Sequence, residues 1–151
     1  MTLRTPLRLA VSGLILLGTS AATLSAQQPI DPDPAAVAVI NSLIEALEIQ
    51  DEAQRTAALV PLLHPVLLTP DGADIVRNFK MILGRRLDRF QGFVTPADFD
   101  RVERVGGGHQ FGSLQVESVD RYHAKKADGG TSLIPVVWTE DGTPKVVGLP
   151  G

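Results

Sequence analysis

The sequence predicts an α+β domain, in which N-terminal helices pack on a curved, cone-like antiparallel sheet near the C-terminus. Two observations carry this prediction. Between about positions 34 and 90, apolar residues recur at three- and four-residue spacing, which is typical of helices that bury one face. From Ser113 to Leu149, apolar runs alternate with the acidic-Gly pairs Asp128-Gly129 and Asp141-Gly142, which are signals of tight hairpin turns. Helices followed by hairpin-linked strands are the order of an α+β fold.

Composition excludes several classes of function. The chain has 151 residues, enough for one domain, and only 5% are aromatic, so aliphatic side chains must fill the core. The formal net charge is -3 and there is no basic stripe, which argues against nucleic acid as a partner. There is no cysteine, which excludes disulfides, a thiol nucleophile and cysteine-ligated metals.

The N-terminus has the layout of an export signal. Arg4 and Arg8 precede a short apolar run, Leu9 to Leu17, and small residues lead to Ala26. The run is well short of the roughly 20 residues that span a bilayer, so we expect cleavage after Ala26 rather than a membrane anchor. The expected organisation is a signal peptide over 1–26, a flexible, proline-rich lead-in over 27–34 and one domain over 35–151. The mature protein would be periplasmic or secreted, with no stable membrane insertion.

Three helices are expected before the sheet. Asp33-Pro34 is a good start for the first, over about 34–50, because Asp can cap a free N–H and Pro suits the first helical position. A second helix should begin at Asp51 and end or kink near Val60, before Pro61. A third is expected over about 73–90, with Gly92 as its stop.

The connection to the sheet is less regular. A short helical turn capped by Thr95 is expected, followed by a strand that includes Val102 to Val105. The segment 106–112 holds four glycines, but no Gly-Lys-Ser/Thr follows and no helix opens there. It therefore predicts a flexible hairpin connection or a bent sheet edge rather than a phosphate-binding loop.

The C-terminal run predicts one long strand and two shorter ones. Leu114 and Val116 share a face, but the alternation breaks before Tyr122, so we expect a β-bulge near residues 117–120. The strand from Leu133 to Trp138 is apolar on both faces, and its Pro135 should either break one neighbouring ladder or mark an edge. Residues 144–149 close the sheet.

Asp120, Tyr122 and His123 are the weak catalytic candidates. Without an intervening bulge, Asp120 and Tyr122 share a face and His123 points the other way. A carboxylate base with a phenol donor suits proton abstraction beside a carbonyl. The alternative is a solvated polar run on an outer strand.

The remaining histidines do not form a metal pattern. His64, His109 and His123 are far apart in sequence with no His-x-x-x-His spacing, so no metal and no cofactor are expected. His109 is expected in a surface loop, and His64 as a cationic residue at a helix end. Trp138 should lie in the core or an interface, and the basic face of Arg85, Arg86 and Arg89 should be solvated.

The last hairpins resemble those of the nuclear transport factor 2-like (NTF2-like) superfamily. The resemblance rests on Val136-Val137-Trp138, the Glu140-Asp141-Gly142 turn and the run from Lys145 to Leu149. It covers roughly the last 40 residues well, and Pro144 stands where the family often has tryptophan. It implies a cone whose sheet and helices enclose a pocket, strands that pair across a homodimer, and members that are either isomerases and dehydratases or simple binding domains.

Together these features predict an exported, non-enzymatic domain. It would bind a small apolar ligand or a protein partner on the concave face of its sheet, and a homodimer is the expected assembly. One alternative is a small lyase or isomerase of the NTF2-like type that uses Asp120 and Tyr122. The other is a structural interaction module without a pocket.

Overall fold

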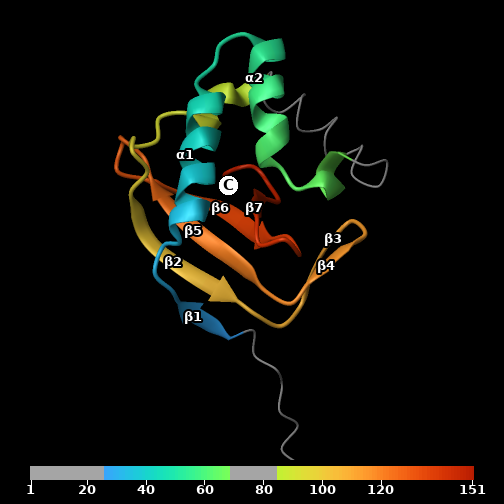
Figure 1. Ribbon diagram of the computed structural model, residues 1–151. Coiled ribbons are helices and arrows are strands. Elements are labelled where there is room, and N and C mark those ends of the chain that lie inside the picture. Colours follow the sequence, from blue (N-terminus) through green and yellow to red (C-terminus); the bar gives the residue numbers. More distant parts are fainter. Residues whose placement is uncertain (1–25, 69–84) are drawn as a thin grey trace, which may run out of the picture.

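The computed structural model describes residues 26–68 and 85–151, and its helices stand on one side of a five-stranded sheet (Figure 1). The α+β class, with helices before a C-terminal sheet, is confirmed. The sheet order is β1-β2-β5-β6-β7, every neighbouring pair is antiparallel, and β3 and β4 form a separate two-stranded hairpin. The strands are β1 Gln27–Pro29, β2 Phe99–Val105, β3 His109–Phe111, β4 Leu114–Val116, β5 Val119–Lys125, β6 Thr131–Trp138 and β7 Pro144–Val146.

The two α-helices begin where their sequence signals predict. In α1 (Pro34–Leu47), the Asp33 carboxylate accepts from the backbone N–H of Ala35 at 2.8 Å, and Pro34 occupies the first turn. In α2 (Glu52–Leu59), Asp51 accepts from Gln54 N–H at 2.8 Å. The expected end near Val60 is also confirmed. Two short 3-10 helices, η1 (Val60–Leu62) and η2 (Pro65–Leu68), follow.

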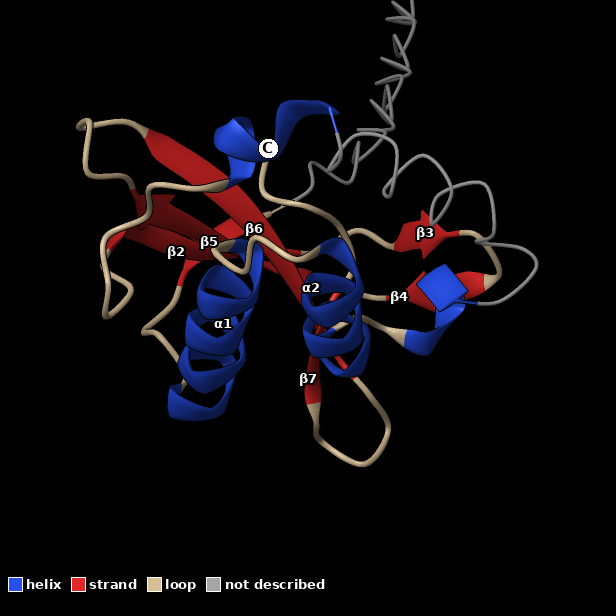
Figure 2. Ribbon diagram, turned by 90° about the horizontal axis from the view of Figure 1, so that it is seen from above, coloured by secondary structure: helices blue, strands red, loops and turns tan. Residues whose placement is uncertain are grey.

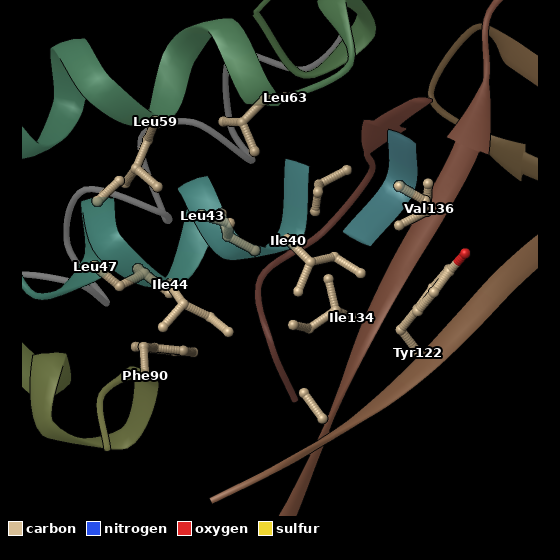
Figure 3. Packing of buried hydrophobic residues seen from close by; sticks show 14 of the residues in the cluster. Ile40, Leu43, Ile44, Leu47, Leu59, Leu63, Phe90, Tyr122, Ile134 and Val136 are labelled. Atoms are coloured by element: carbon tan, nitrogen blue, oxygen red, sulfur yellow. The ribbon is translucent and has the colours of Figure 1, made fainter. Parts of the chain in front are cut away.

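The main core lies between these helices and one face of the sheet (Figure 3). The stripe on α1 that contains Ile40, Leu43 and Ile44 is fully buried, and it belongs to one core cluster with side chains from β5, β6 and β7. Burying an aliphatic side chain is worth about 1.5–3 kcal/mol, so this stripe is what docks α1. The buried sheet residues in this cluster are Val102, Tyr122, Ala124, Ile134, Val136 and Val146.

A smaller cluster lies on the opposite face of the sheet and explains why β6 is apolar on both sides. Val119, Val137 and Val147 are buried there, and side chains of the β3–β4 hairpin pack against them: Phe111, Leu114 and Val116. The hairpin lies beside one end of the sheet, away from α1 (Figure 2).

The expected single long strand with a bulge is wrong. β4 ends at Val116 and pairs with β3, whereas β5 begins at Val119 and pairs with β2 and β6. The break in alternation therefore marks the passage from one sheet to another. A register shift does occur, but in β2, between Phe99 and Arg101. Within the 106–112 segment, residues 109–111 form β3, one arm of this hairpin.

Pro135 lies in β6 between β5 and β7, so it does not mark an edge. Its carbonyl accepts from Val147 N–H at 3.1 Å. The N and C=O of one strand residue point to the same side, so the missing N–H faces the end of β7, just past Val146. The two hairpin turns are as predicted, with Gly129 and Gly142 at φ 91° and 80°.

The segments before α1 and between η2 and β2 differ from several local predictions. The lead-in is not loose at Gln27–Pro29, because β1 pairs with β2. No helical turn forms at Thr95, since this segment instead bonds to the end of β5, where Val94 N–H donates to Lys125 O at 3.0 Å. Residues 73–84 of the expected third helix lie outside the described residues, and its last turn is the 3-10 helix η4, Leu87–Phe90. Gly92 follows with φ 81°, as expected of a stop.

Candidate functional site

The three candidate residues lie on β5, in the middle of the sheet rather than on an outer strand. Asp120 and Tyr122 share the face toward the helices, where they are 2% and 0% exposed. His123 points to the other face. The predicted placement of Asp120 and Tyr122 on one face and His123 on the other is therefore confirmed. The alternative, in which these residues form a solvated polar run on an outer strand, is wrong.

Asp120 is a buried carboxylate whose two oxygens are both occupied. Arg104, its cross-strand neighbour on β2, donates from Nε to Oδ1 at 2.7 Å and from Nη2 to Oδ2 at 2.9 Å. Trp138 on β6 donates from Nε1 to Oδ2 at 2.9 Å. Bidentate arginine–carboxylate bonds are strong and directional. Asp120 therefore ties three neighbouring strands together, and neither oxygen is open to a substrate.

Arg104 forms the solvent side of this cluster. Its side chain is 47% exposed, against 2% for Asp120. The hydrogen bond that Arg104 donates to Asp120 raises the pKa of Arg104 above its usual range, so the guanidinium stays charged. Sequence alone does not reveal the pair, because Arg104 and Asp120 are 16 residues apart and only the β2–β5 register brings them together.

Tyr122 links the sheet to the start of α1. Its hydroxyl accepts from the backbone N–H of Asp33 at 3.2 Å, and its ring meets Phe99 edge-on at 5.2 Å between centroids. Burial raises the pKa of Tyr122, which keeps the phenol protonated. Tyr122 thus fixes α1 on the sheet, and its side chain is surrounded by core residues (Figure 3).

His123 contacts a different partner on the outer face. Its Nε2 lies 3.2 Å from Glu103 Oε1, and both side chains are largely buried, at 14% and 13% exposed. Arg101 approaches the same glutamate at 3.9 Å. His123 and Asp120 are therefore on opposite sides of the sheet and cannot act on one substrate.

The other two histidines also have local partners. His109 lies in β3 rather than in a loop, and its Nε2 is 2.9 Å from Val105 O. It borders an open depression of about 590 Å³ at the base of the hairpin, with Gly108 and Glu117 among its neighbours. The His64 ring accepts from Val66 N–H at 3.1 Å.

The structure argues against His64 as a cationic helix cap. It lies between two 3-10 helices, and burial, followed by the nearby Lys145 charge, lowers its pKa. A neutral ring is therefore favoured at this position.

The described part of the chain offers no other obvious centre. Within residues 26–68 and 85–151 no three histidine, aspartate or glutamate side chains converge as a metal site, and no described helix is long and apolar enough to cross a membrane. Arg85, Arg86 and Arg89 are exposed, as expected of a solvated face. Trp138 is half-buried beside the core.

No protein-family model matches the chain, and no curated protein or solved structure is significantly similar to it. The site must therefore be interpreted from its own geometry.

Proposed function

We propose that this protein is an exported, non-enzymatic interaction domain that binds a protein partner through the outer face of its sheet. The observation that carries the proposal is Arg121, in the middle of β5. Its side chain is half-buried on the outer face, and within the described ranges no carboxylate forms a salt bridge with it. Half-buried arginines beside apolar contacts are typical anchors of protein interfaces.

The surroundings of Arg121 complete an interface-like patch. Across β6 it faces Pro135, and Leu133 lies on the same side of that strand. Both side chains are half-buried, whereas their neighbours on the inner face, Ile134 and Val136, are completely buried against the core. The outer face therefore keeps apolar area accessible beside a cation that has no salt-bridge partner among the described residues.

A second copy of the chain is the partner that the charges fit best. Across β2, Arg121 faces Glu103, so one cationic and one anionic group lie side by side. In a two-fold assembly the same patch meets itself, and Arg121 of one copy can then pair with Glu103 of the other. The resemblance to NTF2-like domains, whose sheets pair across dimers, supports the same arrangement, and we propose a diverged kinship with that superfamily.

Two other functions receive less support from the geometry. A small apolar ligand on the inner face would have to displace the α1 stripe, because Tyr122, Ile134 and Val136 are 0% exposed. An isomerase would need the carboxylate of Asp120 as a base, and Arg104 and Trp138 already occupy it. The export part of the proposal rests on the signal-like N-terminus.

The experiment measures the oligomeric state of the exported protein by sedimentation equilibrium. We expect a dimer that Arg121→Glu and Glu103→Arg each weaken, and that an equimolar mixture of the two variants restores. Arg86→Glu, which reverses an exposed charge outside the patch, should leave the dimer unchanged. A wild-type protein that stays monomeric at all concentrations, or a dimer that is indifferent to both patch substitutions, would contradict the proposal.

A further inference from the structure

We infer that Gln27 becomes the first residue of the mature chain and then closes to pyroglutamate. The inference rests on the export proposed above. Its structural support begins with β1, whose first residue is Gln27, directly after the expected cleavage point at Ala26. All three β1 residues are exposed, so the glutamine side chain is not held in the core.

The backbone of Gln27 faces the open edge of the sheet. Ile30 N–H donates to Val102 O at 3.1 Å, and Gly106 N–H donates to Ala26 O at 3.4 Å. In an antiparallel pair, alternate residues of an edge strand bond to the neighbour, and those between them point away. Positions 26, 28 and 30 therefore face β2, and the nitrogen of Gln27 points outward. It can react without breaking a bond to β2.

The other outward-facing position of β1 fits the same pattern. It is Pro29, which has no N–H to offer and so costs no hydrogen bond at a free edge. Proline on an edge strand also hinders pairing with foreign strands. The edge of the sheet therefore ends in a short strand whose reactive group after cleavage is the α-amine of Gln27.

The ring closure needs no other reactant. The neutral α-amine of Gln27 attacks Cδ of its own side-chain amide, and a five-membered lactam forms. The Cδ–Nε2 bond breaks, and the amide nitrogen leaves as ammonia with the proton released by the amine. An α-amine has a pKa of about 7.7–8.0, so a fraction of it is neutral and nucleophilic near neutral pH.

Cyclisation has a structural consequence for the edge. The nitrogen of Gln27, which carried the Ala26 carbonyl before cleavage, again becomes part of an uncharged amide. An aminopeptidase needs a free α-amine, so the lactam protects β1 from trimming. Since β1 covers the edge of β2 along Glu103 to Val105, its retention keeps that strand paired.

The test uses the full chain, exported with its own N-terminal segment and recovered from outside the cytoplasm. We expect an intact mass that corresponds to residues 27–151 less one ammonia, resistance to N-terminal sequencing, and removal of the block by pyroglutamyl aminopeptidase. A mature chain that begins at Gln27 with a free amine would overturn the inference but leave export standing. An uncleaved chain, or one that begins elsewhere, would overturn both this inference and the expected processing.

Two matched variants separate the chemistry from the processing. Gln27→Asn keeps an amide side chain at the first position but would have to close a strained four-membered ring, so its terminus should stay open. Gln28→Asn leaves the first residue intact and should remain blocked like the wild type. A blocked Gln27→Asn terminus would show that another modification is responsible, and the inference would fall.

Discussion

The pair of Arg104 and Asp120 offers the sharpest test of what holds the sheet together. Arg104→Met keeps most of the aliphatic stem but leaves Asp120, 2% exposed, with Trp138 as its remaining side-chain donor among the described residues. Removing one partner of a buried pair costs about 3–5 kcal/mol. Arg104 is 47% exposed, so water can reach the site on its side. We therefore expect the substitution to lower the free energy of unfolding by about 2–3 kcal/mol.

Urea unfolding followed by tryptophan fluorescence suits this measurement, because Trp138 is the only tryptophan and contacts Asp120 directly. Far-UV circular dichroism checks that unfolding is two-state. The control is Arg101→Met on the same strand, where the side chain is 61% exposed and the ion pair is long, at 3.9 Å. This control substitution should lower the free energy of unfolding by less than about 1 kcal/mol. If the two substitutions are equally mild, the buried pair does not stabilise the sheet and the reasoning fails.

Three further outcomes are expected. Tyr122→Phe should lower the free energy of unfolding by about 1 kcal/mol, because the Asp33 N–H loses its acceptor; no loss in urea unfolding would show that water replaces the hydroxyl. The pKa of His64 is lowered in the folded state, so the unfolded chain binds its proton first and stability should fall as pH drops below about 6.5. In His64→Asn, the free energies of unfolding at pH 7 and pH 5 should differ less than they do in the wild type. An unchanged difference would contradict this. Gly129→Ala should cost about 1 kcal/mol because of its φ of 91°, whereas Gly106→Ala, with open space around the new Cβ, should be nearly neutral in thermal unfolding.

Local signals in the sequence predicted much of the fold. Asp33-Pro34 and Asp51 mark helix starts because capping involves only neighbouring residues. The turns at Gly129 and Gly142 follow equally local rules, since each needs one residue with positive φ. The break in alternation after Val116 is also visible in the sequence, but a bulge within one strand and a passage between two sheets produce the same pattern. Only strand pairing distinguishes them.

For the candidate site, the sequence predicted the face on which each residue lies but not its partners. The period of two places Asp120 and Tyr122 on one face and His123 on the other, whatever the partners are. What these residues do depends on groups far away in sequence. Arg104 reaches Asp120 through the β2–β5 register, and Asp33 reaches Tyr122 across 89 positions because α1 packs on the sheet.

The sequence by itself determined that helices precede a C-terminal antiparallel sheet, where the two helices start, where the hairpin turns lie and on which side of the sheet each candidate lies, because these depend on neighbouring residues. Only the tertiary structure decided that Asp120 is an anchor within the sheet, that Gln27–Pro29 is an edge strand and that Arg121 has no described salt-bridge partner. Those properties arise from contacts between segments whose register is set by packing, and no local pattern encodes them.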